Sequence, residues 1–261
     1  MVEPSSTLAP QARRRLRFDW VARALFRPRE VFPAITSQLG DTWLTPLLIL
    51  TVTALLAVIV AGPLKQVAAQ SAQTALPTDF QYYSPEQQAQ FLQAQAATSG
   101  TTFVYVFPAL VGLLKVWVGW LVLGALLHLV LTLLGGRWTM RSMLNMVAWS
   151  GLPFAVRDLV RSAYMLTSHR LIASPGLSGV VGAESGTLGL LAGSLLGLLD
   201  IYLLWHLALL IIGIRSSTDP GRRKAWTSVL VAQVVALLLQ AGPGVIAAKL
   251  GSLTIIRPFL F

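Results

Sequence analysis

The stretch GLLDIYLLWHLALLI, residues 197–211, decides which kind of fold this chain adopts. It is apolar enough to lie in lipid, yet it carries Asp200 and, two turns later, His206. A charged side chain in the hydrocarbon core of a bilayer is costly unless it finds a partner. The two residues are therefore a catalytic pair, part of an ion pathway, or the polar contacts that hold a helix bundle together, and each reading implies a different function.

The composition of the whole chain indicates a membrane protein. Of its 261 residues 55% are hydrophobic and only 11% are charged, whereas about a quarter of the residues of soluble domains are charged. The formal net charge is +10, but the basic residues flank apolar runs. A nucleic-acid-binding surface would interleave them with polar and aromatic residues, so we expect no nucleic-acid partner. The absence of cysteine excludes disulfides and thiolate metal sites.

Five apolar runs are candidates for membrane-spanning helices, because a helix needs about 20 apolar residues to cross a bilayer. The predicted spans are 44–63, 103–134, 142–166, 188–214 and 225–248. The third is the weakest, since Gly151 and Pro153 can kink it and Arg157, Asp158 and Arg161 burden its second half. It is counted because only an odd number of crossings there reconciles the charges on either side. The predicted fold class is an all-α integral membrane protein, with a five-transmembrane-helix bundle over residues 41–261.

The orientation follows from the lysines and arginines of the short loops, which collect on the cytoplasmic side. Seven arginines precede the first span, two lie in 135–141 and four basic residues lie in 215–225. The alternate loops are poor in basic residues: 64–102 has only Lys65, and 167–187 has only Arg170. This pattern predicts a cytoplasmic N-terminus and an extracytoplasmic C-terminus.

The N-terminal segment reads as a basic disordered cytoplasmic tail over 1–15, followed by an interfacial amphipathic helix over 16–40. Phe18, Val21 and Leu25 follow helical spacing, and the charged start lacks the short apolar region of a signal peptide. Such a helix lies beside anionic lipid headgroups. The alternative is a disordered tail throughout, which would leave Trp20, Phe26 and Phe32 exposed without reason. The residues expected to contact anionic lipid are Arg13, Arg14, Arg15, Arg17, Arg23, Arg27 and Arg29.

Residues 64–102 form a glutamine-rich loop that we expect outside the cytoplasm. It holds nine glutamines and three charged residues. Ser84 is a candidate N-cap, with Pro85 at the first helical position and Gln87 at the capping-box position. The loop therefore extends the first span and returns as a short helix.

Glycines and charges share faces on two of the predicted spans. Gly189, Gly193 and Gly197 form a doubled GxxxG pattern that allows close helix approach, and Asp200 falls on nearly the same face. Gly112 and Gly119 flank Lys115 on the second span. We predict that Asp200 is neutralised by Lys115 or by Arg157, and that Asp158 and Arg161 complete an intramembrane ion-pair network. An Asp200 carboxylate more than about 6 Å from both cations would reject this.

The sequence gives little support for metal binding, proton transfer or catalysis. His128 and His206 are weak metal or proton-site candidates, since such histidines more often hydrogen-bond a neighbouring carbonyl. The sequence has no HExxH, no GxSxG and no P-loop. We therefore expect no enzyme activity and no cofactor.

Several motifs, in this order and spacing, resemble bacterial members of the YIP (Ypt-interacting protein) family. They are ALFRPREVFPAI (24–35), LHLVLTLLGGRWTMRSMLNMVAWSGLPFAVRDL (127–159) and LLIIGIRSSTDPGRRKAWTSVL (209–230). The resemblance implies a five-span bundle with a cytoplasmic N-terminus and no catalytic residues. The cytoplasmic D-L-Y-G-P-type motif of eukaryotic relatives, which engage Rab GTPases, is absent here. Some bacterial relatives are accessory subunits of macrolide-exporter-like ABC transporters.

These observations predict a non-enzymatic multi-pass protein of the bacterial plasma membrane, an accessory or scaffolding subunit of a complex such as an ABC-type exporter. Its partner would be a permease or adaptor subunit. One alternative is a small transporter or channel with a polar path lined by Lys115, Arg157, Asp158 and Asp200. Another is a membrane-organising homo-oligomer, in which a cation such as Arg161 is met by a second copy.

Overall fold

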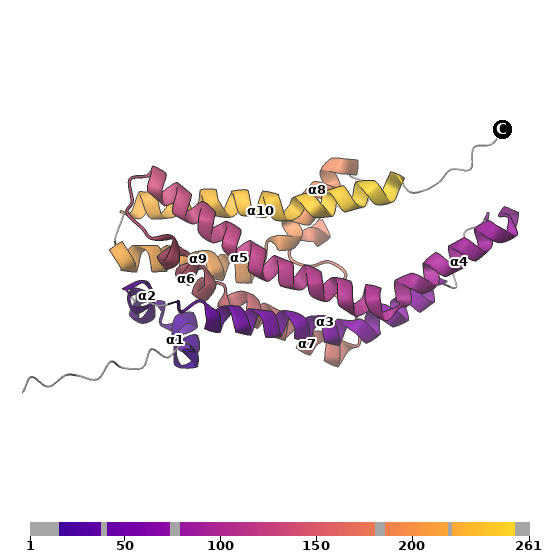
Figure 1. The fold of residues 1–261 in the computed structure, drawn as a ribbon, viewed down its shortest axis with the longest axis horizontal. Coiled ribbons are helices and arrows are strands. Elements are labelled where there is room, and N and C mark those ends of the chain that lie inside the picture. The colour runs from indigo at the N-terminus through magenta and orange to yellow at the C-terminus, as the bar shows by residue number, and fades with distance from the viewer. Residues whose placement is uncertain (1–15, 38–40, 74–78, 181–185, 219–220, 254–261) are drawn as a thin grey trace, which may run out of the picture.

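The computed structural model describes residues 16–37, 41–73, 79–180, 186–218 and 221–253, and every regular element in these ranges is a helix (Figure 1). The first half comprises η1 (Phe18–Trp20), α1 (Val21–Phe26), α2 (Pro28–Ser37), α3 (Leu44–Gln73), η2 (Phe80–Tyr82), α4 (Pro85–Ser99), the π-helical η3 (Thr102–Val106) and α5 (Phe107–Leu133). The second half comprises α6 (Met140–Ser150), α7 (Leu152–Ser168), η4 (Ser178–Val180), α8 (Gly186–Leu198), α9 (Ile201–Thr218) and α10 (Arg222–Leu253). The all-α prediction is confirmed. The tail 1–15, with Arg13, Arg14 and Arg15, lies outside the described residues.

Three of these helices, α3, α5 with η3, and α10, are long and apolar enough to cross a membrane. The pair α8 and α9, bent by 63° at a short break, passes the same test together, which gives up to four spans. The fourth predicted span was continuous over 188–214; the structure breaks it instead at Leu199 and Asp200. The stretch predicted as the third span forms α6 and α7, which Gly151 separates, and α7 lies along α3 in the bundle (Figure 1).

The N-terminal helices pack against the bundle through their apolar side chains. Phe32 and Ile35 of α2 are fully buried and belong to the same core cluster as Leu210 and Ile214 of α9. Trp20 is buried beside Trp149, with ring centroids 5.8 Å apart. Of the residues predicted to form the apolar face of an interfacial helix, Val21 and Leu25 pack against this core cluster, whereas Phe18 is 54% exposed. The position of these helices at the membrane surface stays a prediction.

Two polar side chains fix the start of α3. The Oδ1 atom of Asn145, on α6, accepts hydrogen bonds from the backbone N–H groups of Thr42 and Trp43, each at 3.1 Å. Asn145 is 1% exposed, so it satisfies donors at a helix N-terminus that would otherwise be buried without partners. The indole of Trp149 donates to Thr42 Oγ1 at 3.3 Å. These bonds tie α6 to the beginning of α3.

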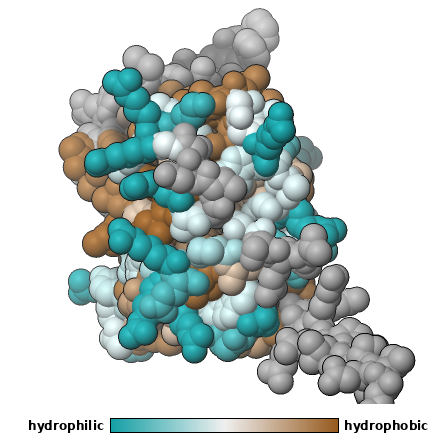
Figure 2. Space-filling model, turned by 90° about the vertical axis from the view of Figure 1, so that its left-hand side faces the viewer, coloured by the Kyte–Doolittle hydropathy of each residue, from teal (hydrophilic) through white to brown (hydrophobic). Residues whose placement is uncertain are grey.

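Basic side chains gather at the end of the bundle formed by α1, α2 and the turns before α6 and α10, which we call the basic end. Figure 2 looks onto this end, where hydrophilic side chains cover much of the visible surface. The exposed basic residues here are Arg23, Arg27, Arg29, Arg137, Arg141, Arg215, Arg222, Arg223 and Lys224. Arg17, also predicted to contact lipid, instead stacks on Trp20 at 3.9 Å and pairs with Asp19 at 3.3 Å.

At the opposite end, the last part of α3 and the whole of α4 project away from the body of the bundle (Figure 1). The predicted start of α4 is confirmed: Ser84 and Gln87 form a capping box, and Pro85 opens the helix. The main contacts of α4 are with α3 and η3. We call residues 64–102 the hairpin.

Candidate functional site

A cavity of about 900 Å³ lies inside the bundle, a volume within the range of small-molecule sites. Its walls come from α3 and from α5 to α10, together with the segment before η4. The lining combines apolar and charged side chains. The charged and polar lining residues are Lys115, Arg157, Asp158, Arg161, Ser178, Ser194, His206, Gln233 and Gln240.

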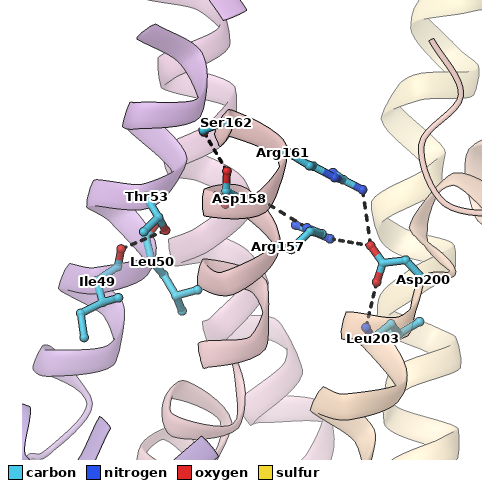
Figure 3. Close-up of polar contacts among 9 residues, drawn as sticks. All are labelled: Ile49, Leu50, Thr53, Arg157, Asp158, Arg161, Ser162, Asp200 and Leu203. Atoms are coloured by element: carbon cyan, nitrogen blue, oxygen red, sulfur yellow. Dashed lines mark hydrogen bonds and ion pairs between the residues drawn. The ribbon is translucent and has the colours of Figure 1, made fainter. Parts of the chain in front are cut away.

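The charged wall is built on α7, where Arg157 and Arg161 are one helical turn apart and point the same way (Figure 3). Both reach the same oxygen of Asp200: Arg157 Nη1 lies 3.6 Å and Arg161 Nη2 lies 3.4 Å from Oδ2. Arg157 also pairs with Asp158 at 3.4 Å. The Asp200 side chain is 11% exposed, so the pairs are shielded from water and the charges depend on one another.

Asp200 occupies this position because it caps a helix. Its Oδ1 atom accepts a hydrogen bond from the backbone N–H of Leu203 at 2.9 Å (Figure 3). That bond satisfies one of the unpaired donors at the start of α9, as Asp commonly does at an N-cap. Asp200 therefore uses one oxygen to begin α9 and the other to bind two arginines. Irregular backbone of this kind occurs inside membranes where it is buried in protein or lines a cavity.

Of the two predicted cationic partners for Asp200, the structure selects Arg157 and adds Arg161. Lys115 lines the cavity, but within the described ranges no hydrogen bond or ion pair is formed by its ammonium group. Arg161, which the sequence placed in the network without naming its partner, pairs with Asp200. Both arginines of the network therefore find their carboxylate partner within the same chain.

The segment that precedes η4 closes the end of α8. Gly176 has φ +59°, a conformation that favours glycine. A Cβ atom there would lie 2.7–2.8 Å from the carbonyl oxygens of Leu196, Gly197 and Leu199. The backbone N–H of Leu177 donates to the Leu196 carbonyl at 2.9 Å. The chain therefore passes directly over the last carbonyls of α8, and only glycine fits that approach.

His206 lies at the inner part of the cavity and is almost fully buried. Its Nδ1 atom is 2.8 Å from the carbonyl oxygen of Ser150, which agrees with the carbonyl-bonded role that the sequence favoured. The side chain of Gln233 lies beside the ring and forms a hydrogen bond with it, although the contact falls short of ideal geometry at His206 Nε2 and Gln233 Oε1. The other weak candidate, His128, lies on α5 outside the cavity lining.

The described residues contain no group of three or more His, Cys, Asp or Glu side chains that could hold a metal ion. The ion-pair cluster is instead dominated by arginine, whose guanidinium groups bind carboxylates and phosphates. What this arrangement can do is stabilise a negatively charged group in a low-dielectric site.

Three of the glycines predicted to hold the second and fourth spans together have no neighbouring helix against them. A Cβ atom added at Gly112, Gly119 or Gly193 would meet nothing within 4 Å. Gly119, Gly189, Gly193 and Gly197 line the cavity instead. Small side chains here leave space inside the bundle.

The close helix contacts lie at glycines that the sequence did not single out. A Cβ at Gly213 would lie 2.8 Å from the Phe32 ring, and one at Gly124 would lie 2.6 Å from Leu144 Cδ2. At Gly62 it would overlap the ring of Tyr105. A single glycine within an apolar helix can indicate such a close contact. Of these three, only Gly213, in the IIGIR motif, stands in a recognisable sequence pattern.

The arrangement can be compared with known proteins. Searches among curated proteins and among solved structures each found no match. The model of the Yip1 domain matches residues 22–242, which include α2, every helix that lines the cavity, and the hairpin. A match over most of the chain shows its membership: the protein belongs to the Yip1 domain family.

Proposed function

We propose that this protein is a non-enzymatic accessory or scaffolding subunit of a membrane complex in the bacterial plasma membrane, such as an ABC-type exporter. In this proposal α6 and α7 together form a fifth span, the basic end faces the cytoplasm and anionic lipid, and the hairpin lies outside. The gathering of exposed arginines at one end supports the orientation. The ABC-type partner rests on the resemblance to bacterial relatives.

The hairpin is the observation that carries the proposal. It projects from the bundle (Figure 1) and holds nine glutamines but only three charged residues. Its exposed large apolar side chains include Tyr82 at 80% and Leu92 at 49%. Exposed apolar side chains on a surface with few charges are typical of protein contact sites. We infer that the hairpin contacts a permease or adaptor subunit.

Affinity purification in mild detergent tests this contact. The tagged full chain is expected to recover permease or adaptor subunits of an ABC transporter, and the double variant Tyr82→Ser and Leu92→Gln is expected to lose them. Val180→Gln is the matched control, because Val180 is 82% exposed but lies outside the hairpin. Recovery of the same subunits with the double variant would overturn the role of the hairpin, and recovery of the chain alone would overturn the accessory function.

A second candidate function, a small transporter, is favoured by the broken helix beside the cavity. Three of the four residues of the predicted polar path, Lys115, Arg157 and Asp158, line the cavity, and Asp200 is paired with Arg157. Half-helices that end at a cavity are a feature of transporter binding sites. Solute flux into liposomes containing only this protein, abolished by Asp200→Asn, would support transport. Recovery of a second, differently tagged copy would instead support the homo-oligomer.

A further inference from the structure

We propose that the cavity binds an anionic amphiphile, a molecule with one phosphate or carboxylate head and a hydrocarbon chain, and that Lys115 holds the head. This inference does not depend on whether the protein is an accessory subunit or a transporter. It rests on the charge, the apolar surface and the volume of the cavity.

The cavity lining carries one positive charge that no carboxylate balances, which favours binding of an anion. Arg157 and Arg161 are balanced by Asp158 and Asp200, with which they form the pairs described above. Lys115 is the remaining cation among the lining residues. A lone ammonium group on a span is costly in a bilayer unless it is paired. A bound anion in the cavity would supply the missing charge.

The apolar part of the cavity lining favours binding of a hydrocarbon chain. Leu47 and Leu50 of α3 belong to the lining, and Val116, Trp120 and Leu123 of α5 continue it on one helix with Lys115. A ligand anchored at Lys115 would therefore extend along apolar side chains. Burial of a chain of methylene groups contributes about 0.8 kcal/mol for each.

The volume of the cavity fits the same ligand. About 900 Å³ lies within the range of small-molecule sites, which leaves room for a head group and a hydrocarbon chain.

Native mass spectrometry of the purified full chain in mild detergent tests the charge requirement. Phosphatidylglycerol is expected to bind about tenfold more tightly than phosphatidylcholine with the same acyl chains, which corresponds to about 1.4 kcal/mol. Lys115→Gln should remove the preference and Lys115→Arg should keep it. Lys65→Gln is the control, since Lys65 is an exposed lysine outside the cavity lining. Equal binding of the two lipids, or an unchanged preference in Lys115→Gln, would overturn the proposal.

A second pair of variants tests the place of binding without changing charge. Gly119→Leu would fill the cavity, because Gly119 lines it and a Cβ there meets nothing within 4 Å. Gly112→Leu makes the same change two turns away on α5, equally free of contacts but outside the lining. Loss of amphiphile binding in Gly119→Leu alone is expected. Equal binding by both variants would place the ligand elsewhere and reject the cavity.

Competition experiments identify the source of the ligand. Inorganic phosphate is expected not to displace phosphatidylglycerol, and displacement at matched concentration would show that the site recognises phosphate without a chain, against the proposal. Dodecyl phosphate is expected to compete. Tighter binding of the phospholipid would identify the bilayer as the source, and tighter binding of dodecyl phosphate would identify a free amphiphile.

Discussion

Replacing Asp200 with leucine is expected to lower the free energy of unfolding by about 3–5 kcal/mol, the usual cost of leaving buried charges without their partner. Arg157 and Arg161 would both lose the carboxylate that they share, at 3.6 and 3.4 Å. The N-cap of α9 would be lost as well, since Oδ1 accepts from Leu203 N. The measurement is thermal or denaturant unfolding in mild detergent, followed by tryptophan fluorescence.

Two further variants separate the charge from the cap. Asp200→Asn keeps a residue that caps helices well but removes the charge, so its cost is expected to come from the arginines alone. In a background where Arg157 and Arg161 are both leucine, Asp200→Leu should cost much less, because no arginine then depends on the Asp200 carboxylate.

An exposed ion pair in the same chain provides the control. Arg141 and Asp41 are 3.0 Å apart, but their side chains are 55% and 52% exposed. Asp41→Leu should therefore cost at most about 1 kcal/mol, as is usual for surface pairs. If Asp200→Leu were no more damaging than Asp41→Leu, the arginines would not depend on Asp200 and the proposed network would be wrong.

The second large effect is expected from Gly213→Leu, which overfills the contact between α2 and α9. A Cβ at this position would lie 2.8 Å from Phe32 Cδ1 and 3.2 Å from Met146 Cγ. Phe32 is fully buried, so the ring can move only by displacing α2. Overpacking of this kind costs about 1–3 kcal/mol, and we expect the N-terminal helices to become more susceptible to limited proteolysis.

Two further variants test whether the effect of Gly213→Leu comes from its contact with Phe32. Gly112→Leu adds the same side chain to a helix with nothing within 4 Å of its Cβ, and is expected to leave stability unchanged or to raise it slightly through helix propensity. Phe32→Ala combined with Gly213→Leu should recover part of the lost stability. Equal stability and equal proteolysis of Gly213→Leu and Gly112→Leu would show that α2 is not held against α9 as described.

The helical fold was predictable because its signals are local. Runs of about 20 apolar residues, the capping box at Ser84 and the gathering of arginines each depend on short stretches of sequence. The break at Asp200 was not predicted, since neither glycine nor proline stands beside it. It becomes evident only when the arginines of α7 are seen to bind the same carboxylate.

The candidate site was predictable in its residues but not in its shape. Lys115, Arg157, Asp158, Arg161 and Asp200 were expected to form one network; the structure brings four of them together and leaves Lys115 out of the ion pairs. A polar path lined by Lys115, Arg157, Asp158 and Asp200 was one of the predicted alternatives, but the sequence did not decide between it and a closely packed bundle, because the glycine spacing on α8 is equally compatible with close helix contact and with empty space. The position of the neighbouring helices decides between close contact and empty space. That position depends on tertiary contacts, which the residue spacing along one helix does not reveal.

The central claim, that a polar cavity lies within this membrane bundle, is tested most directly by single-cysteine labelling, for which a chain without native cysteine is a clean background. Cysteine is placed at Gly119 or Gly193, which line the cavity, or at Leu121, which is 51% exposed on the outer face of α5. A small charged thiol reagent reacts with the thiolate, which forms in a hydrated site and not in lipid. We predict fast modification of Gly119→Cys and Gly193→Cys and slow modification of Leu121→Cys; equal rates at all three positions would contradict the cavity.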